Sequence, residues 1–258
     1  MRSVYAVYRK EMGHYFVSPV AYVVVAVFLI VAGFFFRLYM GLANDQAMEM
    51  AMQGMGSDMD VPAEVLRAFF GLISTLILFL APMLTMGVYA EERRRGTMEL
   101  LMTSPITEFQ IVLGKFLATL TLFAIMLFPT SLYVAYMCYH SDPKMQWSLV
   151  LTGYLGALLL GASLLAIGSF ISSLTESQLI AVVLSFGAIL ILWVLDFVVR
   201  GSDSVAGTVL QYISVIHHYD DFTRGIIDTS SLIYYVSVPI LFLFLTVRSI
   251  DSIRWRRA

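Results

Sequence analysis

The apolar run Phe69–Tyr89, FFGLISTLILFLAPMLTMGVY, is followed after one residue by the charged stretch Glu91–Pro105, EERRRGTMELLMTSP. The first stretch can cross a hydrocarbon core of about 30 Å as a helix, which takes roughly 17 to 25 residues. The second holds the densest group of charges in a chain that is 59% hydrophobic and 13% charged, with a mean hydropathy of +0.83. This composition predicts an integral membrane protein.

Six runs have the length and apolar character of membrane-spanning helices. They are Pro19–Phe36, Phe69–Tyr89, Phe116–Cys138, Trp147–Ile171, Leu179–Val199 and Thr229–Val247. A transmembrane β-barrel would instead show short segments of alternating polarity. We therefore expect an all-α protein whose residues 1–258 form one transmembrane domain, with outer segments at 37–68 and 200–231.

The distribution of Lys and Arg predicts the orientation, because cytoplasmic loops carry the excess of positive residues. With both termini inside, eleven of the 16 Lys and Arg residues lie on the cytoplasmic side. The charged stretch then lies in a cytoplasmic loop, residues 90–106, between the second and third spans.

The N-terminal stretch MRSVYAVYRKEMGHYFVSPVAY places a basic region before the first span. Val4, Val7, Tyr8 and Met12 recur at helical spacing, so residues 2–16 predict an amphipathic helix on the inner membrane surface, within an interfacial segment 1–18. A frayed basic tail is the alternative. No small-residue cleavage site follows, which argues against a signal peptide.

Several motifs that would define a function are missing. The sequence has no GxxxxGK[ST] loop for nucleotide phosphates, no HExxH and no paired-cysteine motif. The predicted spans also hold almost none of the charged residues that ion-coupled carriers use as relays. If this protein moves a substrate, the energy for this movement must come from elsewhere.

The cytoplasmic loop has an ordered layout. Gly96 is expected to end the second helix, and Thr97–Thr103 can form about two turns with an apolar side. Ser104 is expected to be the N-cap of the next helix, with Pro105 at its first position. A short helix of this kind suits docking into a groove of a cytoplasmic partner. The alternative is that the arginines anchor the second helix and bind anionic lipid.

Residues Tyr89–Ala118, YAEERRRGTMELLMTSPITEFQIVLGKFLA, resemble the first cytoplasmic loop of permease subunits of type-2 ABC exporters. The matching positions are Glu92, Arg94, Gly96, Thr97, Glu99, Leu100, Leu101, Thr103 and Pro105. A second stretch, HHYDDFTRGIIDTSSLIYYVSV from His217, is similar to the segment before the last helix in the gliding-motility-associated branch of these permeases.

This resemblance implies a permease subunit that works with separate cytoplasmic ABC ATPase subunits and with a second permease copy or a sister permease. ATP and Mg would bind to the ATPase and no cofactor to this chain. The loop would be the coupling helix, and its expected ATPase-binding residues are Glu91, Glu92, Arg93, Arg94, Arg95, Gly96, Thr97, Glu99, Leu100, Leu101, Thr103 and Pro105. Membrane lipids and a periplasmic accessory protein are further expected partners, nucleic acid is not, and the location would be the bacterial inner membrane.

Three other groups of residues are candidates for a role. Asp196 and Arg200 have the spacing of a helical ion pair near the outer end of the fifth span. Met48, Met50 and Met52 could supply soft ligands to Cu(I), although an adaptable apolar surface is the simpler interpretation. Gly153, Gly156, Ala157, Gly161, Gly168 and Ser169 in the fourth span favour close helix packing, within the bundle rather than between subunits.

Two other function classes stay open. A membrane-embedded enzyme would have His14, His140, His217 and His218 as candidate bases, but these lie scattered near the membrane edges without a convergent acid. A membrane anchor could recruit an ATPase for mechanical work on envelope partners without moving a solute. The sequence leaves the substrate open, and the nearly charge-free spans favour a lipidic or amphipathic one.

Overall fold

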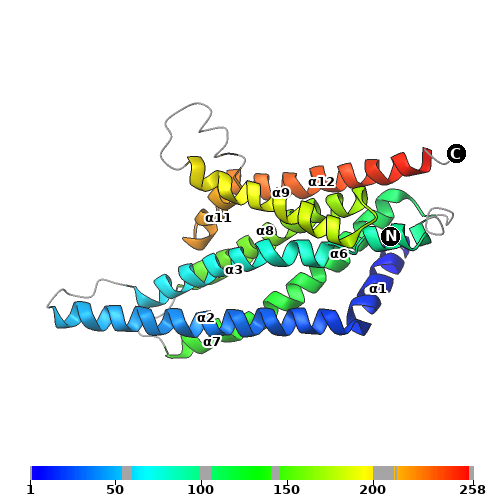
Figure 1. The fold of residues 1–258 in the computed structure, drawn as a ribbon. Helices are drawn as coiled ribbons and strands as arrows, with labels where there is room; N and C mark the ends of the chain where they lie inside the picture. The colour runs from blue at the N-terminus through cyan, green and yellow to red at the C-terminus, as the bar shows by residue number, and fades with distance from the viewer. Residues whose placement is uncertain are drawn as a thin grey trace.

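The computed structural model describes residues 2–53, 60–98, 106–140, 146–199, 212 and 214–255, which form helices joined by short connections (Figure 1). Within these ranges there is no strand. Six helical stretches are long and apolar enough to cross a membrane. The prediction of an all-α membrane protein with six spans is therefore confirmed.

The helices run mostly along one axis. In chain order they are α1 (Arg2–Val17), α2 (Pro19–Met52), α3 (Val61–Thr85), α4 (Ala90–Arg94), α6 (Glu108–Leu127), a 3₁₀ turn (Phe128–Thr130), α7 (Ser131–His140), α8 (Trp147–Leu174), α9 (Gln178–Val199), α11 (Val215–Thr223) and α12 (Thr229–Trp255). Figure 1 shows both termini at the end of the bundle that carries α4, here called the α4 end. The opposite end carries α11 and is called the α11 end.

The first span is much longer than predicted. Helix α2 continues without a break through Met52, so its 34 residues reach roughly 51 Å at 1.5 Å per residue. A hydrocarbon core of about 30 Å accounts for only part of this length. Residues 37–52, which were expected in an outer loop, therefore continue the helix of the first span.

Helix α3 also begins before the predicted start of its span. The side chain of Asp60 accepts a hydrogen bond from the backbone N–H of Ala63 at 3.2 Å, and Pro62 occupies the first turn. Both features stabilise a helix N-terminus. The helix therefore begins at Val61 instead of Phe69.

Helix α6 begins at Glu108, which is before the predicted start of the third span, Phe116, but after Pro105, the predicted first helical residue. Helix α6 has Thr107 as its N-cap, and the Gln110 side chain accepts a hydrogen bond from the Thr107 N–H at 3.4 Å. The expectation of an N-cap at Ser104 and a first helical residue at Pro105 is wrong for this helix, because Ile106 and Thr107 are not helical. At the observed start, Thr107 and Gln110 form a capping box, which satisfies a free backbone donor at the helix N-terminus.

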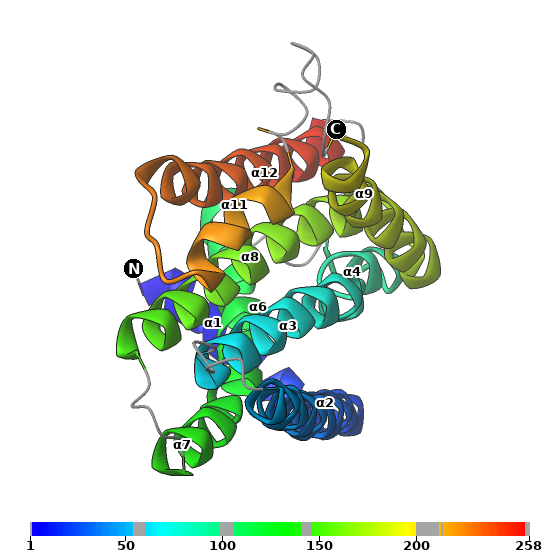
Figure 2. The same cartoon turned by 90° about the vertical axis from the view of Figure 1, so that its left-hand side faces the viewer.

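Helix α8 is the central element and contacts α3, α4, α6, α9, α11 and α12 (Figure 2). Its glycines let aromatic side chains of its neighbours approach the backbone. A Cβ added at Gly153 would lie 2.2 Å from the ring of Phe70, and one at Gly161 would lie 2.3 Å from the ring of Phe123. The small residues of this helix thus serve packing within the chain, as the sequence favoured.

Helix α11 is a short buried element within the segment that was predicted to lie outside the membrane. Val215, Tyr219 and Phe222 belong to the main hydrophobic core. The Tyr219 hydroxyl donates to the backbone oxygen of Phe70 at 3.0 Å, and the Tyr235 hydroxyl donates to that of Val215 at 2.6 Å. These contacts join α11 to α3 and α12.

Helix α1 packs on α6 as well as presenting an apolar surface. Val7 is buried against Gly114, where an added Cβ would come within 2.9 Å of the Val7 side chain. Tyr5, Phe16 and Val17 are exposed. The amphipathic character of this helix is present in the structure, and its position on the membrane surface stays a prediction.

Candidate functional site

The α4 segment begins where the second span is interrupted. Helix α3 ends at Thr85, residues 86–89 form a turn, and α4 starts at Ala90. A break in a helix leaves backbone groups without their usual partners. Here the Ser172 hydroxyl of α8 accepts from the N–H groups of Tyr89 and Ala90 at 3.2 and 3.3 Å, and it donates to the Met86 oxygen at 3.0 Å.

A group of four charges, three of them largely buried, joins α4 to α1 and α6. One carboxylate oxygen of Glu92 lies 3.0 Å from the Nζ atoms of both Lys10 and Lys115. The Lys115 ammonium also lies 2.9 Å from the Glu11 carboxylate and donates to the backbone oxygen of Val88 at 3.0 Å. These four side chains, Lys10, Glu11, Glu92 and Lys115, are called the charge cluster below.

The charge cluster is balanced, with two acids and two bases. The Lys115 side chain is only 1% exposed, whereas that of Lys10 is 57% exposed. Partial burial lowers the pKa of Lys10, but its hydrogen bond to Glu92 and the charge of that residue outweigh this effect and raise the pKa overall. Lys10 therefore remains a cation at neutral pH, because the Glu92 carboxylate lies within ion-pair distance.

Tyr15 lies beside the charge cluster on α1. Its hydroxyl shares a hydrogen bond of 3.1 Å with the hydroxyl of Thr119 on α6. Burial raises the pKa of Tyr15 to about 12, so it stays a neutral phenol. The contact adds a second polar link between α1 and α6.

Glu91 and Arg93 connect α4 to the junction between α8 and α9. Arg93 donates to the backbone oxygen of Ser173 at 2.7 Å and pairs with Glu176 at 3.3 Å. Glu91 accepts a hydrogen bond from the Gln178 side chain at 3.1 Å and also pairs with Arg95. The Arg93 contact satisfies a carbonyl at the end of α8, where helices have free acceptors.

The outward edge of the α4 segment is formed by Arg94, Arg95, Gly96 and Thr97, all of which are exposed. Gly96 has a φ angle of 70°, a left-handed conformation that favours glycine, so the predicted helix break at this residue is confirmed. Thr97 and Met98 are helical, and Met98 is buried. The remaining predicted coupling residues, Glu99, Leu100, Leu101, Thr103 and Pro105, lie outside the described residues.

The structure thus separates the predicted ATPase-binding residues into two sets. Glu91, Glu92 and Arg93 are used in contacts within the chain, while Arg94 to Thr97 face outward. The role of the second set in binding an ATPase stays a prediction.

The other predicted sites do not converge. His14 belongs to α1 at the α4 end, while His217 and His218 belong to α11 at the opposite end. In the part of the chain that the structure describes, no group of three or more His, Cys, Asp or Glu residues could hold a metal ion. Met48, Met50 and Met52 lie on the extension of α2 with exposed side chains. Arg200 and the side chains of Asp196 and His140 lie outside the described residues.

Sequence reasoning missed Glu11, Lys115, Ser172 and Gln178 as parts of this site. In the sequence analysis, Lys115 was used only as a positive residue that indicates the orientation of the chain. In the structure it lies two turns inside an apolar helix. A lone charge at such a position usually marks a buried pair. Its partner Glu11 lies four residues after the buried Val7, which is the spacing of one helix face.

The family comparison covers nearly the whole of this architecture. A protein-family model described as ABC-2 family transporter protein matches residues 5–249. No curated protein matches the sequence. The family consists of transporter subunits rather than enzymes, and membership implies partnership with an ABC ATPase subunit. Because the match extends from α1 into α12, the chain belongs to the ABC-2 transporter family and is a multi-pass membrane permease component of an ABC transporter.

Proposed function

We propose that this chain is the permease subunit that transmits the motion of a separate cytoplasmic ABC ATPase to membrane helices, in order to export or extract an amphipathic substrate across the bacterial inner membrane. The α4 end then faces the cytoplasm, in agreement with its excess of Lys and Arg. ATP and Mg would bind only to the partner subunit.

The division of α4 into a fixed side and a free side carries this proposal. On the fixed side, Glu91, Glu92 and Arg93 contact α1, α6, the end of α8 and the start of α9. On the free side, Arg94 and Thr97 are exposed. A partner that displaces this edge would therefore pull on four helices through polar contacts of 2.7 to 3.1 Å.

The charge cluster suits such transmission because its geometry is narrowly defined. A buried ion pair that loses one partner leaves an uncompensated charge, which costs about 3–5 kcal/mol. Helices α1, α4 and α6 are therefore expected to move together as one unit.

A second permease completes the proposed transporter. Val27 and Ile30 of α2, together with Val183 and Ile191 of α9, expose large apolar side chains. Such faces are covered by lipid or by another apolar helix in a membrane. The resemblance to the gliding-motility branch stays a prediction.

The proposal is tested by purifying the tagged chain from its native host in mild detergent and identifying the bound proteins by mass spectrometry. We expect a P-loop ATPase at stoichiometric levels. Arg94→Glu should lower its recovery about tenfold or more, since reversing one charge-assisted contact costs about 1.5–3 kcal/mol. ATP hydrolysis and substrate movement should fall in parallel.

Arg9→Glu is the matched control, because Arg9 is an exposed arginine of α1 at the same end. It should leave ATPase recovery unchanged. Equal recovery with Arg94→Glu and Arg9→Glu would remove the α4 edge from the ATPase interface. ATP turnover that depends on this chain without any substrate movement would favour the mechanical anchor.

A further inference from the structure

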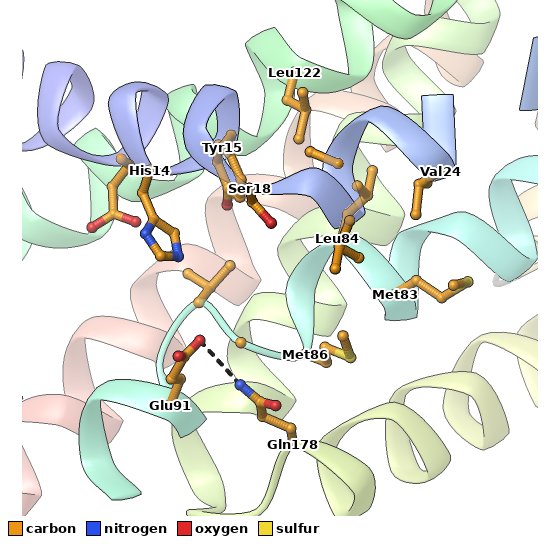
Figure 3. A pocket seen from close by; sticks show the side chains of 15 residues that line it. His14, Tyr15, Ser18, Val24, Met83, Leu84, Met86, Glu91, Leu122 and Gln178 are labelled. Atoms are coloured by element: carbon orange, nitrogen blue, oxygen red, sulfur yellow. Dashed lines mark hydrogen bonds between the residues drawn. The ribbon is translucent and has the colours of Figure 1, made fainter. Parts of the chain in front are cut away.

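A cleft of about 380 Å³ opens at the α4 end, between α1, α2, α3, α6 and the start of α9 (Figure 3). Its size falls within the roughly 300–1,000 Å³ of small-molecule sites. The turn before α4 and Glu91 of α4 form part of its wall. The site therefore lies directly beside the proposed ATPase-docking edge.

The cleft has one polar and one apolar side. Figure 3 shows His14 and Glu91 on one side and Val24 and Met83 on the other. The apolar side comprises Val20, Ala21, Val24, Met83, Leu84 and Leu122. A ligand that fills both sides must be an amphiphile, because apolar surface favours a hydrocarbon chain and a carboxylate favours a polar head.

The charge of the lining favours a cation. Two carboxylates, those of Glu11 and Glu91, line the cleft, and none of the Lys and Arg residues that the structure describes does so. The bases that pair with them, Lys10, Lys115 and Arg95, are not part of the lining. A carboxylate has about four acceptor positions, so it can accept from a ligand while keeping its present partner. An anionic head would instead face two like charges.

Glu91 also connects the cleft to the coupling segment. Its hydrogen bond to Gln178, 3.1 Å long, joins α4 to α9 across the polar side of the cleft (Figure 3). An ammonium bound to Glu91 would share the negative charge of that carboxylate with the Gln178 amide, which weakens the hydrogen bond between the two side chains. Occupancy of the cleft would thereby change the attachment of α4 to α9.

We propose that this cleft binds an amphiphile with a primary-amine head at Glu91 and Glu11 and hydrocarbon along Val24 and Met83. Binding of the ligand changes the contact between α4 and α9 and so transmits the occupancy of the cleft to the α4 segment. The signalling half of this proposal rests on the proposed function, whereas the binding half does not.

The binding half is tested on the purified full-length chain without any ATPase, in phosphatidylcholine nanodiscs. The probe is radiolabelled dodecylamine, and labelled laurate serves as the counter-probe with a similar chain and an anionic head. After subtraction of uptake by empty nanodiscs, we expect saturable amine binding near one per chain. Laurate should bind about tenfold more weakly or worse, as expected for loss of a charge-assisted contact.

Two variants act on the two sides of the cleft. Glu91→Gln should weaken dodecylamine binding about tenfold by removing the charge, and Val24→Trp should do so by filling the apolar side. Val23→Trp is the control, because Val23 is an exposed neighbour on α2 that does not line the cleft. Unchanged amine binding in both Glu91→Gln and Val24→Trp, or equal saturable binding of laurate, would overturn the site.

The source of the amine is settled by repeating the measurement in nanodiscs that contain phosphatidylethanolamine. Competition by this lipid would identify a membrane aminolipid as the occupant, and its absence would identify an amphiphilic cargo. Amine binding without any co-purifying ATPase would leave the cleft in place and refute the coupling proposal, so the two failures are distinguishable.

Discussion

The two ends of the bundle are held together by different interactions. At the α4 end, the charge cluster and the Ser172 hydroxyl connect elements through charged and polar contacts. At the α11 end, aromatic rings are buried in the core, and single hydroxyl groups donate to backbone oxygens. The His218 ring there stacks on Tyr234 with 4.2 Å between centroids.

From this difference we infer which end of the bundle responds to a partner. Charge pairs have defined geometry and depend strongly on the presence of both members. Packed aromatic rings depend mainly on volume and close contact. The α4 end should therefore be sensitive to the loss of one charge, and the α11 end to a change in size.

The largest effect is expected from Lys115→Met at the α4 end. This change leaves Glu11 and Glu92 without their shared buried cation, which costs about 3–5 kcal/mol. The loss of stability is measured by unfolding this variant and its control in detergent with heat or denaturant. Lys10→Met is the control and should cost about 0–1 kcal/mol, because Lys10 is the exposed member of the cluster. Equal losses of stability in the two variants would contradict the expectation that the buried lysine contributes more than the exposed one.

A smaller loss is expected from Gly156→Ala at the α11 end. The added Cβ would lie 2.6 Å from the Cβ of Phe222, so α11 must shift away from α8. Overpacking of this kind costs about 1–3 kcal/mol. Hydrogen exchange should rise in α11 and remain unchanged in α4.

Gly187→Ala is the matched control for that variant, because no atom of another described element lies within 4 Å of a Cβ at Gly187. It should be neutral or stabilise α9 by about 0.5–1 kcal/mol. Increased exchange at both ends in Gly156→Ala would show that the two ends are not independent.

Acid should loosen the α11 end before the α4 end. Burial lowers the pKa of His218 below its usual 6.5, although the nearby Asp221 and Asp228 act in the opposite direction. At a pH just below 6.5, the unfolded chain therefore binds more protons than the folded chain. Stability is lost as the pH falls below about 6.5. Hydrogen exchange of α11 at several pH values measures this loss. His218→Phe keeps an aromatic ring for Tyr234 and should remove the pH dependence.

The smallest effect on stability is expected from Arg94→Ala. Arg94 is exposed, and surface substitutions usually change stability by no more than about 0.5 kcal/mol. Glu92→Ala, two positions earlier, removes the anionic partner of both lysines and should cost several times more. Thermal unfolding of the two variants side by side makes this comparison. Similar losses would show that the α4 segment has no separate fixed and free sides.

Much of the architecture was predictable from the sequence, because spans depend on local composition. The helix break at Gly96 and the small residues of α8 could also be predicted, since each has a short-range signal. The starts of α3 and α6 were predicted poorly. Their caps, Asp60 and Thr107, stand outside the apolar runs that defined the spans.

The sequence by itself determined that this chain is a six-helix membrane protein with one charged loop that resembles a coupling segment. Only the tertiary structure decided which charges pair, because Glu92 meets Lys10 from 82 positions away and Lys115 meets Glu11 from 104. The same holds for the cleft, whose walls come from helices far apart in the chain. Such contacts depend on how helices pack, and hydropathy measured along the chain carries no information about that packing.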